Sequence, residues 1–492
     1  MELQFDKEVC PCLRFLTSQV QSQEQTQEVR LPDGMQDVGR VLGAWGQVLI
    51  RGKEWRGNGM SVTGGVLGWA LYMQEDGSEP RMVDTWIPFQ MKWDFPESQR
   101  DGTIHVWPLL EGMDARCVSA RKILFRSTVS MLGEAMEPSS VELYRPGSIP
   151  EDVQLLKNTY PTVLPVEAGE KQFLIQEDLE PGTEIPKILR YCVKLQINEQ
   201  RVMANRLVFR GTAYLQILCG GEKISPWNTE LPFSQYVDLD GSYGDQATAS
   251  IRLIPTALEL EKNEQGALQL KLGAAAQYVI WERVMMDAVE DAYSPFRMVE
   301  LQKSEWEVPA LLDIHKQPVA LESEWNGEGN IVDTAFYCGY PQIRQDGDTL
   351  EAKIPGQFQM LFTDEEGQLQ GTSVKGETHW QMGSDKDNRH HFFWQSGFPA
   401  AENAMDGYTL RQEMQTEVSV FANSAMTHIT GLEMSDAAAP DPARPALVLR
   451  RCGGQRLWDI AKSAGSTVDA IQKANGITEE PEADRMLLIP VI

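Results

Sequence analysis

The sequence of 492 residues is poor in basic charge, in histidine and in long apolar runs. It has 44 Lys and Arg against 71 Asp and Glu, a formal net charge of −27, which makes nucleic acid and anionic lipid surfaces poor partners. No apolar run approaches the roughly 18 residues that a membrane-spanning helix needs, so we expect no membrane insertion. The first residues are acidic where a signal peptide carries positive charge, which predicts synthesis in the cytoplasm.

Residues suited to chemistry are also scarce. The seven cysteines are scattered and odd in number, and six histidines include one adjacent pair, His390-His391, whose side chains would point to opposite faces of a strand. Asp287 and Asp291 would share one face of a helix, but in so acidic a chain a solvated surface is the simpler interpretation. The sequence shows no nucleophile motif, phosphate loop or zinc motif. We therefore expect no enzyme activity, no metal and no cofactor.

What the sequence does contain is a repeat. Runs of alternating large apolar and polar or small residues recur, each with a central glycine, at Gly65, Gly211 and Gly356, which lie 146 and then 145 residues apart. In the first two runs an Ile/Leu-Pro-Phe element follows the glycine; in the third it has faded. The spacing predicts three tandem β-sandwich or barrel-like modules, at residues 1–145, 146–315 and 316–434. Three unrelated β domains of similar composition are the alternative.

Two proline-rich stretches predict linkers. Residues 137–150 precede the second module, and residues 435–445, rich in Ala and Pro, should form an extended spacer. Later strand candidates are 117–129, 267–279 and 409–421.

Residues 446–492 have a different pattern, which predicts strand, helix, helix, strand. Apolar residues at helical spacing end at Gly465, a second helix ends at Gly476, and Ser466 with Asp469 fits a capping box. Gly454-Gln455-Arg456-Leu457-Trp458-Asp459-Ile460-Ala461, Ala474-Asn475-Gly476-Ile477 and Leu488-Ile489-Pro490 resemble a LysM module. The resemblance implies a groove that binds N-acetylglucosamine glycans, formed by Gly454, Gln455, Arg456 and Leu457 on one side and by Gly476, Ile477 and Thr478 on the other. Both departures from the LysM pattern, at 454–457 and 483–485, lie at this groove, so a protein ligand stays open.

With that tail, the repeats are similar to the SPOCS-domain proteins of spore-forming bacteria, which are morphogenetic factors of the spore coat and envelope. The resemblance implies a non-enzymatic assembly protein made in the mother cell and placed at the forespore surface, where the LysM tail binds a coat protein or glycan. The alternative is a peptidoglycan-binding protein of cortex or wall. Trp55 and Trp93, in polar surroundings, are candidate interface aromatics. The oligomeric state is left open.

Overall fold

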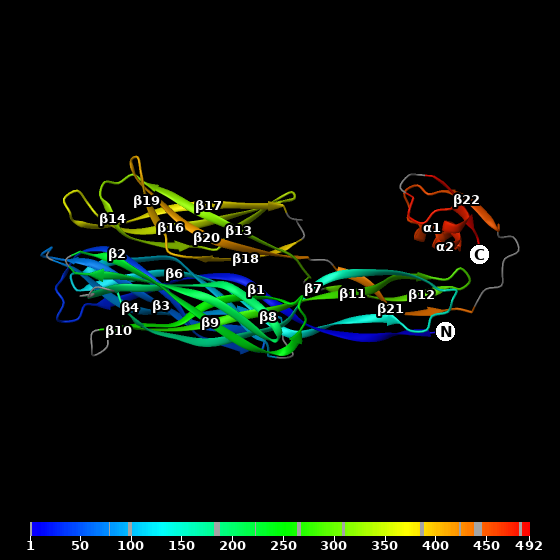
Figure 1. Cartoon of the computed structure of the whole chain (residues 1–492), viewed down its shortest axis with the longest axis horizontal. Helices are drawn as coiled ribbons and strands as arrows, with labels where there is room; N and C mark the ends of the chain where they lie inside the picture. Colours follow the sequence, from blue (N-terminus) through cyan, green and yellow to red (C-terminus); the bar gives the residue numbers. More distant parts are fainter. Residues whose placement is uncertain are drawn as a thin grey trace.

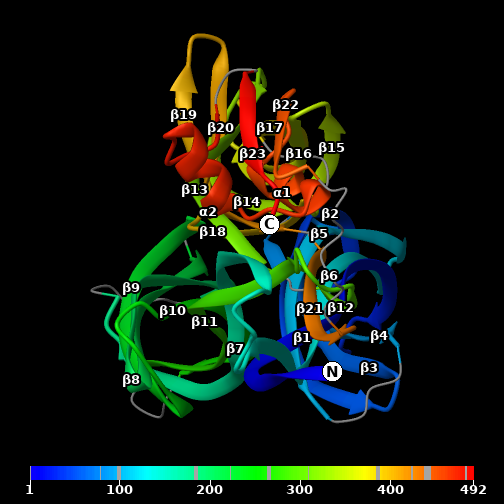
Figure 2. The ribbon, with the colours of Figure 1, turned by 90° about the vertical axis from the view of Figure 1, so that its right-hand side faces the viewer.

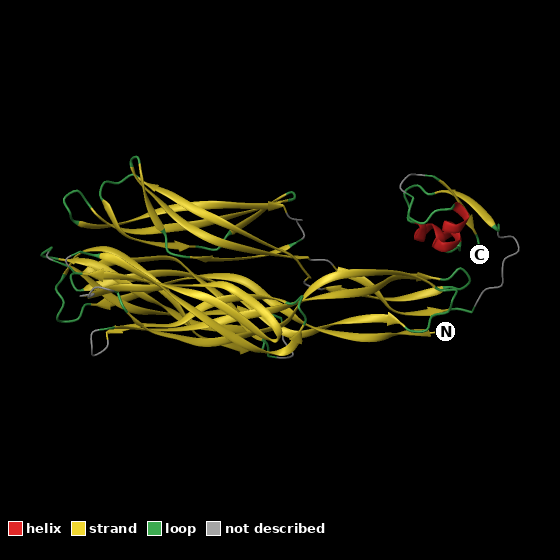
Figure 3. Ribbon diagram, in the orientation of Figure 1, coloured by secondary structure: helices red, strands yellow, loops and turns green. Residues whose placement is uncertain are grey.

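A computed structural model describes residues 2–492 except 78, 97–100, 182–186, 222, 263–266, 308–309, 384–387, 423–424, 437–444 and 482–484. The described chain is built almost wholly from antiparallel strands, and its helices, α1 (Leu457–Ala464) and α2 (Val468–Asn475), lie near the C-terminus (Figure 3). The prediction of a mainly β chain that ends in a small helical module is therefore confirmed. Residues 437–444, most of the predicted linker 435–445, lie outside the described residues.

The first unit is a barrel-like arrangement of two sheets. β1, β6 and β5 are neighbours in one sheet and β2, β3 and β4 in the other, while β2 contacts β5 and β1 contacts β4. The strands are β1 (Glu2–Arg30), β2 (Val38–Arg56), β3 (Gly59–Gln74), β4 (Pro80–Asp94), β5 (Thr103–Ser119) and β6 (Lys122–Pro146). The candidate strand 117–129 is therefore wrong, because the turn between β5 and β6 divides it.

The second unit repeats this plan with a continuous strand in place of a hairpin. Its strands are β7 (Gln154–Leu179), β8 (Lys187–Gly220), β9 (Ser225–Tyr243), β10 (Thr248–Lys262) and β11 (Leu268–Tyr293). The two halves of β8 lie side by side: Asn198 Nδ2 donates to Thr212 Oγ1 at 2.9 Å, and Arg190 Nη2 donates to Gln216 Oε1 at 3.0 Å. Between them the chain turns near Ala204, whose φ is +51°. β8 thus supplies the equivalents of both β2 and β3.

The third unit follows the same order with shorter strands. They are β12 (Val299–Glu307), β13 (Ala310–Trp325), β14 (Asn330–Cys338), β15 (Gln342–Asp346), β16 (Thr349–Thr363), β17 (Leu369–Gly383), β18 (Arg389–Ser396), β19 (Ala400–Ala404), β20 (Gly407–Ala422) and β21 (Ala425–Met434). β16 pairs with β14, β15 and β17, as β3 pairs with β2 and β4. The predicted boundary between residues 315 and 316 falls within β13.

The central glycines occupy the middle strand of each unit, but the first one is displaced by one position. Gly211 pairs with Phe233, and the residue that pairs with the corresponding Phe89 is Gly64, not Gly65. A Cβ atom on Gly64 would meet the Leu49 carbonyl and the Phe89 ring, and one on Gly211 would meet the Gln196 carbonyl and the Phe233 ring. The glycines are therefore required by close approach of a neighbouring backbone and of the following phenylalanine.

Three ribbons project beyond the units and pack together as a stem (Figure 1). They are the outer parts of β1 with β6, of β7 with β11, and of β12 with β21, and β21 also pairs with β1. Residues from different ribbons share small apolar cores, for example Cys12, Leu164 and Met286, and nearer the tip Phe5, Val289 and Leu432. The predicted linker at 137–150 is thus wrong over 137–146, which is paired strand.

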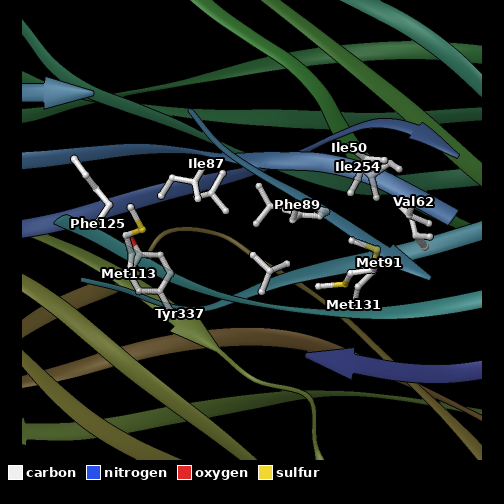
Figure 4. Packing of buried hydrophobic residues seen from close by; sticks show 14 of the residues in the cluster. Ile50, Val62, Ile87, Phe89, Met91, Met113, Phe125, Met131, Ile254 and Tyr337 are labelled. Carbon is white, nitrogen blue, oxygen red and sulfur yellow. The ribbon is translucent and has the colours of Figure 1, made fainter. Parts of the chain in front are cut away.

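The three units pack side by side around a common junction (Figure 2). The apolar core of the first unit includes Ile254 from the second and Tyr337 from the third (Figure 4). The Gly46 backbone N–H donates to the Tyr337 hydroxyl at 3.2 Å. Burial of apolar surface at these contacts joins the three units into one folded body rather than three independent domains.

Candidate functional site

The C-terminal module stands at the end of the stem and has a small core that also includes Tyr293 of β11. β22 (Leu447–Arg451) and β23 (Met486–Pro490) pair as a two-stranded sheet, and α1 and α2 pack against it through Leu457, Ile460, Ile471, Leu487 and Ile489. Gly465 and Gly476 end the two helices in the left-handed conformation, with φ of 60° each. The predicted strand, helix, helix, strand order is present.

The cap of the second helix differs in detail from the prediction. Thr467, not Ser466, is the N-cap, and its hydroxyl accepts a hydrogen bond from Ala470 N at 3.1 Å. Asp469 pairs instead with Lys473, one turn along the helix. The capping box that the spacing predicts is replaced by a simple threonine cap.

The residues of the predicted groove lie on two adjacent loops. The first loop turns through Gly453 and Gly454, with φ of 56° and 75°, and the second begins at Gly476. The Glu480 carboxylate, just past the second loop, accepts from Leu457 N at 2.8 Å and so ties the second loop to the start of α1. Arg456 occupies the N-cap position of α1, but its side chain makes no capping hydrogen bond. The Glu480 carboxylate takes this role by accepting from the first free amide of the helix, Leu457 N.

Most of the groove residues are accessible. Gly454, Gln455, Arg456, Gly476 and Thr478 are exposed, Ile477 is half-buried, and Leu457 belongs to the core of the module. The Arg456 guanidinium is held by Asp459 at 3.1 Å. The accessible donors and acceptors of these loops are suited to polar recognition.

A second accessible surface lies on the outer face of the two-stranded sheet. Because side chains alternate along a strand, Val448, Leu487 and Ile489 face the helices while their neighbours face outward. These outward residues form the outer leucine face, defined by Leu447, Leu449, Met486 and Leu488, which are 54%, 61%, 50% and 39% exposed. Leu449 and Leu488 are register partners, so the apolar groups are contiguous. A clustered apolar surface of this kind is typical of an interaction site.

Charge sets the module apart from the remainder of the chain. Residues 446–492 contain six basic and six acidic residues, so the net charge of −27 resides in residues 1–445. An approaching partner therefore meets a neutral, partly apolar end of an otherwise acidic molecule.

The module docks onto the stem through the end of β11. The Tyr293 hydroxyl donates to the Ser466 carbonyl at 2.9 Å, and the Tyr293 ring lies edge-on to Trp458 with centroids 4.8 Å apart. Asp291 accepts from the Trp458 indole N–H at 2.9 Å and from Lys462 Nζ at 2.7 Å. Burial by itself raises the pKa of the Asp291 carboxyl, but the hydrogen bonds from Lys462 and Trp458 outweigh it and hold the pKa below its ordinary value.

The sequence-predicted aromatics lie in the first unit, away from this module. Trp93 is 1% exposed, and its indole N–H donates to the Gln19 carbonyl at 3.0 Å, so it is a core residue that cannot anchor a partner. Its polar sequence neighbours alternate to the outer face of β4. Trp55 is half-buried and packs against the Phe95 ring, 4.8 Å away.

Charged groups that sequence reasoning did not connect meet where the three units join. Glu134 of the first unit accepts from Arg252 of the second at 2.5 Å and lies 3.1 Å from His391 of the third. Burial alone raises the pKa of the Glu134 carboxyl, and the Arg252 charge with the His391 contact holds it far below its ordinary value. Within the described residues, no group of three or more His, Cys, Asp or Glu side chains is arranged to hold a metal ion.

Asp287 and Asp291 lie on strand β11, not on a helix. Asp287 accepts from the Thr159 hydroxyl at 2.7 Å, whereas Asp291 serves the docking contact. Neither the docking role of Asp291 nor the junction role of His391 carries a local sequence signal, because each partner is more than a hundred residues away.

Comparison with known protein families gives a match within the second unit. Residues 184–258 match the SipL, SPOCS domain family model. The chain contains a SPOCS domain. The match spans β8, β9 and most of β10, and a SPOCS domain indicates a role related to sporulation. No curated protein and no solved structure matches the chain significantly. Among the helices that the structure describes, none is both long and apolar enough to cross a membrane.

Proposed function

We propose that the chain is a non-enzymatic scaffold of the spore coat or envelope, whose C-terminal module attaches it to a protein partner at the forespore surface. The SPOCS match supports a role in sporulation. The observation that carries the proposal is the placement of the module: it is held at the end of a long, interlocked β body by Asp291 and Tyr293, with the outer leucine face exposed. Such an arrangement presents a binding surface at a fixed distance from the body.

The exposed side chains favour a protein over a glycan as the principal ligand. A partner with an apolar patch would bury Leu447, Leu449, Met486 and Leu488, which a sugar does not require. Glycan binding at the two loops is the second candidate, and the accessible Gln455 and Arg456 favour it. In the LysM-like interpretation the two ligands would occupy different faces of one module.

Two variants separate these functions in sporulating cells. Leu449→Asp places a charge on the outer leucine face, and Lys473→Asp places the same charge on α2, where the native side chain is also exposed. We expect a fluorescently tagged chain to form a ring around the forespore, and Leu449→Asp, but not Lys473→Asp, to disperse it. Dispersal by neither variant, or retention after deletion of residues 446–492, would contradict attachment through the module.

A pull-down on purified peptidoglycan tests the second candidate. Replacement of Gln455 and Arg456 by alanine should abolish retention if the loops bind glycan, while Leu449→Asp should leave it unchanged. Equal retention of the intact chain and the chain without residues 446–492 would remove glycan binding by the module.

A further inference from the structure

A cavity of about 180 Å³ lies where the three units meet. Its walls come from every unit: Trp45 and Trp107 from the first, Arg190 and Lys194 from the second, and Tyr337 and Trp394 from the third. For comparison, an engineered apolar cavity of about 150 Å³ in another protein holds a benzene molecule. The space is therefore large enough for a compact ring.

Three buried polar atoms beside this cavity lack a hydrogen-bond partner among the described residues: Arg190 Nε, the Trp45 indole N–H and Asp333 Oδ1. Arg190 is 1% exposed and forms an ion pair with Asp333, yet its Nε atom has no hydrogen-bond partner in the described structure. The same holds for the Trp45 indole N–H, whose ring lies under the Arg190 guanidinium at 5.4 Å. These atoms have almost no accessible surface, so a ligand in the cavity would not reach them, and Asp333 Oδ1 is itself an acceptor beside Arg190. The polar group that the cavity offers to a ligand is therefore Lys194.

The cavity also has a surplus of positive charge. Arg190, Cys192 and Lys194 alternate along β8 and all line it, because residues two apart face the same side of a strand. Asp333 balances Arg190, whereas no carboxylate of the described residues is within 4.0 Å of Lys194 Nζ. In a chain of net charge −27, a half-buried lysine without an acidic neighbour is unexpected.

We propose that this cavity binds a small aromatic carboxylate. The ring would pack against the tryptophans of the wall, Trp45, Trp107 and Trp394, and the carboxylate would accept from Lys194. Aromatic side chains favour a ring by stacking, and a charge-assisted hydrogen bond selects an anion over a neutral analogue. Because the walls come from three units, occupancy would also strengthen their association.

Benzoate is a suitable probe, with benzyl alcohol as its neutral counterpart. Ligand-observed NMR on the full chain should show saturable, one-to-one binding of benzoate at millimolar concentration or below. Lys194→Met should weaken benzoate binding about tenfold and leave benzyl alcohol nearly unchanged. The matched control is Lys157→Met, an exposed lysine on β7, which should change neither.

A blocking variant keeps the test decisive. Ser396→Phe places a ring at the cavity wall and should abolish binding of both probes, with circular dichroism used to verify the fold. The proposal is overturned if benzoate shows no saturable binding up to about 10 mM. Equal weakening by Lys194→Met and Lys157→Met, or binding that survives Ser396→Phe in the folded protein, would also overturn it.

Discussion

Replacement of Asp291 by alanine should release the C-terminal module from the stem without unfolding either part. The carboxylate accepts one hydrogen bond from the Trp458 indole and an ion pair from Lys462. A hydrogen bond to a charged group contributes about 1.5–3 kcal/mol, whereas the Lys462 ion pair adds well under 1 kcal/mol, because the lysine is 41% exposed. A loss of about 2 kcal/mol changes the ratio of docked to undocked molecules about 30-fold.

Hydrogen exchange measured by mass spectrometry on the full chain reports this equilibrium. Peptides covering residues 456–466 and 288–296 should exchange faster in Asp291→Ala, while peptides from the barrel cores should not change. Asp287→Ala is the matched control, since Asp287 lies on the same strand and contacts Thr159 rather than the module. Asp291→Asn should be intermediate, because an amide oxygen can still accept from the Trp458 indole.

Acid provides a second test of the same contact. Because the pKa of Asp291 is lowered in the docked state, docking is fully stabilised above the ordinary pKa of 3.8 and weakens as the pH falls through the lower docked value. Exchange at the interface should therefore accelerate in that range in the wild type but not in Asp291→Ala. If Asp291→Ala and Asp287→Ala exchange alike at neutral pH, the Asp291 carboxylate does not hold the module.

Three further predictions concern the β body. Arg190→Met should destabilise the fold by about 3–5 kcal/mol, because it leaves Asp333 buried and unpaired, and the double variant with Asp333→Leu should recover much of this in denaturant unfolding. Burial lowers the pKa of His105 to about 3, so the unfolded chain gains a proton first, and stability should fall from pH 6.5 to 5 by about 2 kcal/mol, a slope that His105→Gln removes. Gly211→Ala should prevent soluble expression or lower the melting temperature sharply, whereas Gly244→Ala, with no atom within 4 Å of its added Cβ, should be tolerated.

Local sequence patterns correctly predicted the helices and strands that depend on interactions between residues close together in the chain. The β-α-α-β order of the tail followed from Gly465 and Gly476, which end helices wherever they lie in the fold. Alternation along 61–72 and 207–218 likewise predicted strands, although the structure buries most residues on both faces of each, since neighbouring units also pack there. Local patterns could not tell which of the adjacent Gly64 and Gly65 is the required glycine. Only the strand register, in which Gly64 pairs with Phe89, distinguishes them.

The linker prediction at 137–150 failed for a definite reason. Prolines interrupt a central strand, and Pro138 and Pro146 therefore indicated a break. In the structure β5 pairs with β6 only up to Met136, so beyond that point β6 has β1 on one side and no β5 on the other. A proline that directs its missing N–H to an open edge costs no ladder hydrogen bond. Pro138 and Pro146, which suit an edge strand, were thus the same residues that made this strand of the stem look like a linker.

The contacts between units explain why a threefold repeat does not make three interchangeable parts. Lys53 and Glu170 bridge the first and second units, Arg190 and Asp333 bridge the second and third, and Glu134 joins all three. A charge buried against the wrong surface would lack its partner, which would cost several kcal/mol. Each unit is therefore stable only beside the units that carry the partners of its buried charges. Exchange of the segments 187–197 and 38–50 between units should therefore prevent assembly of the junction even where each barrel still folds.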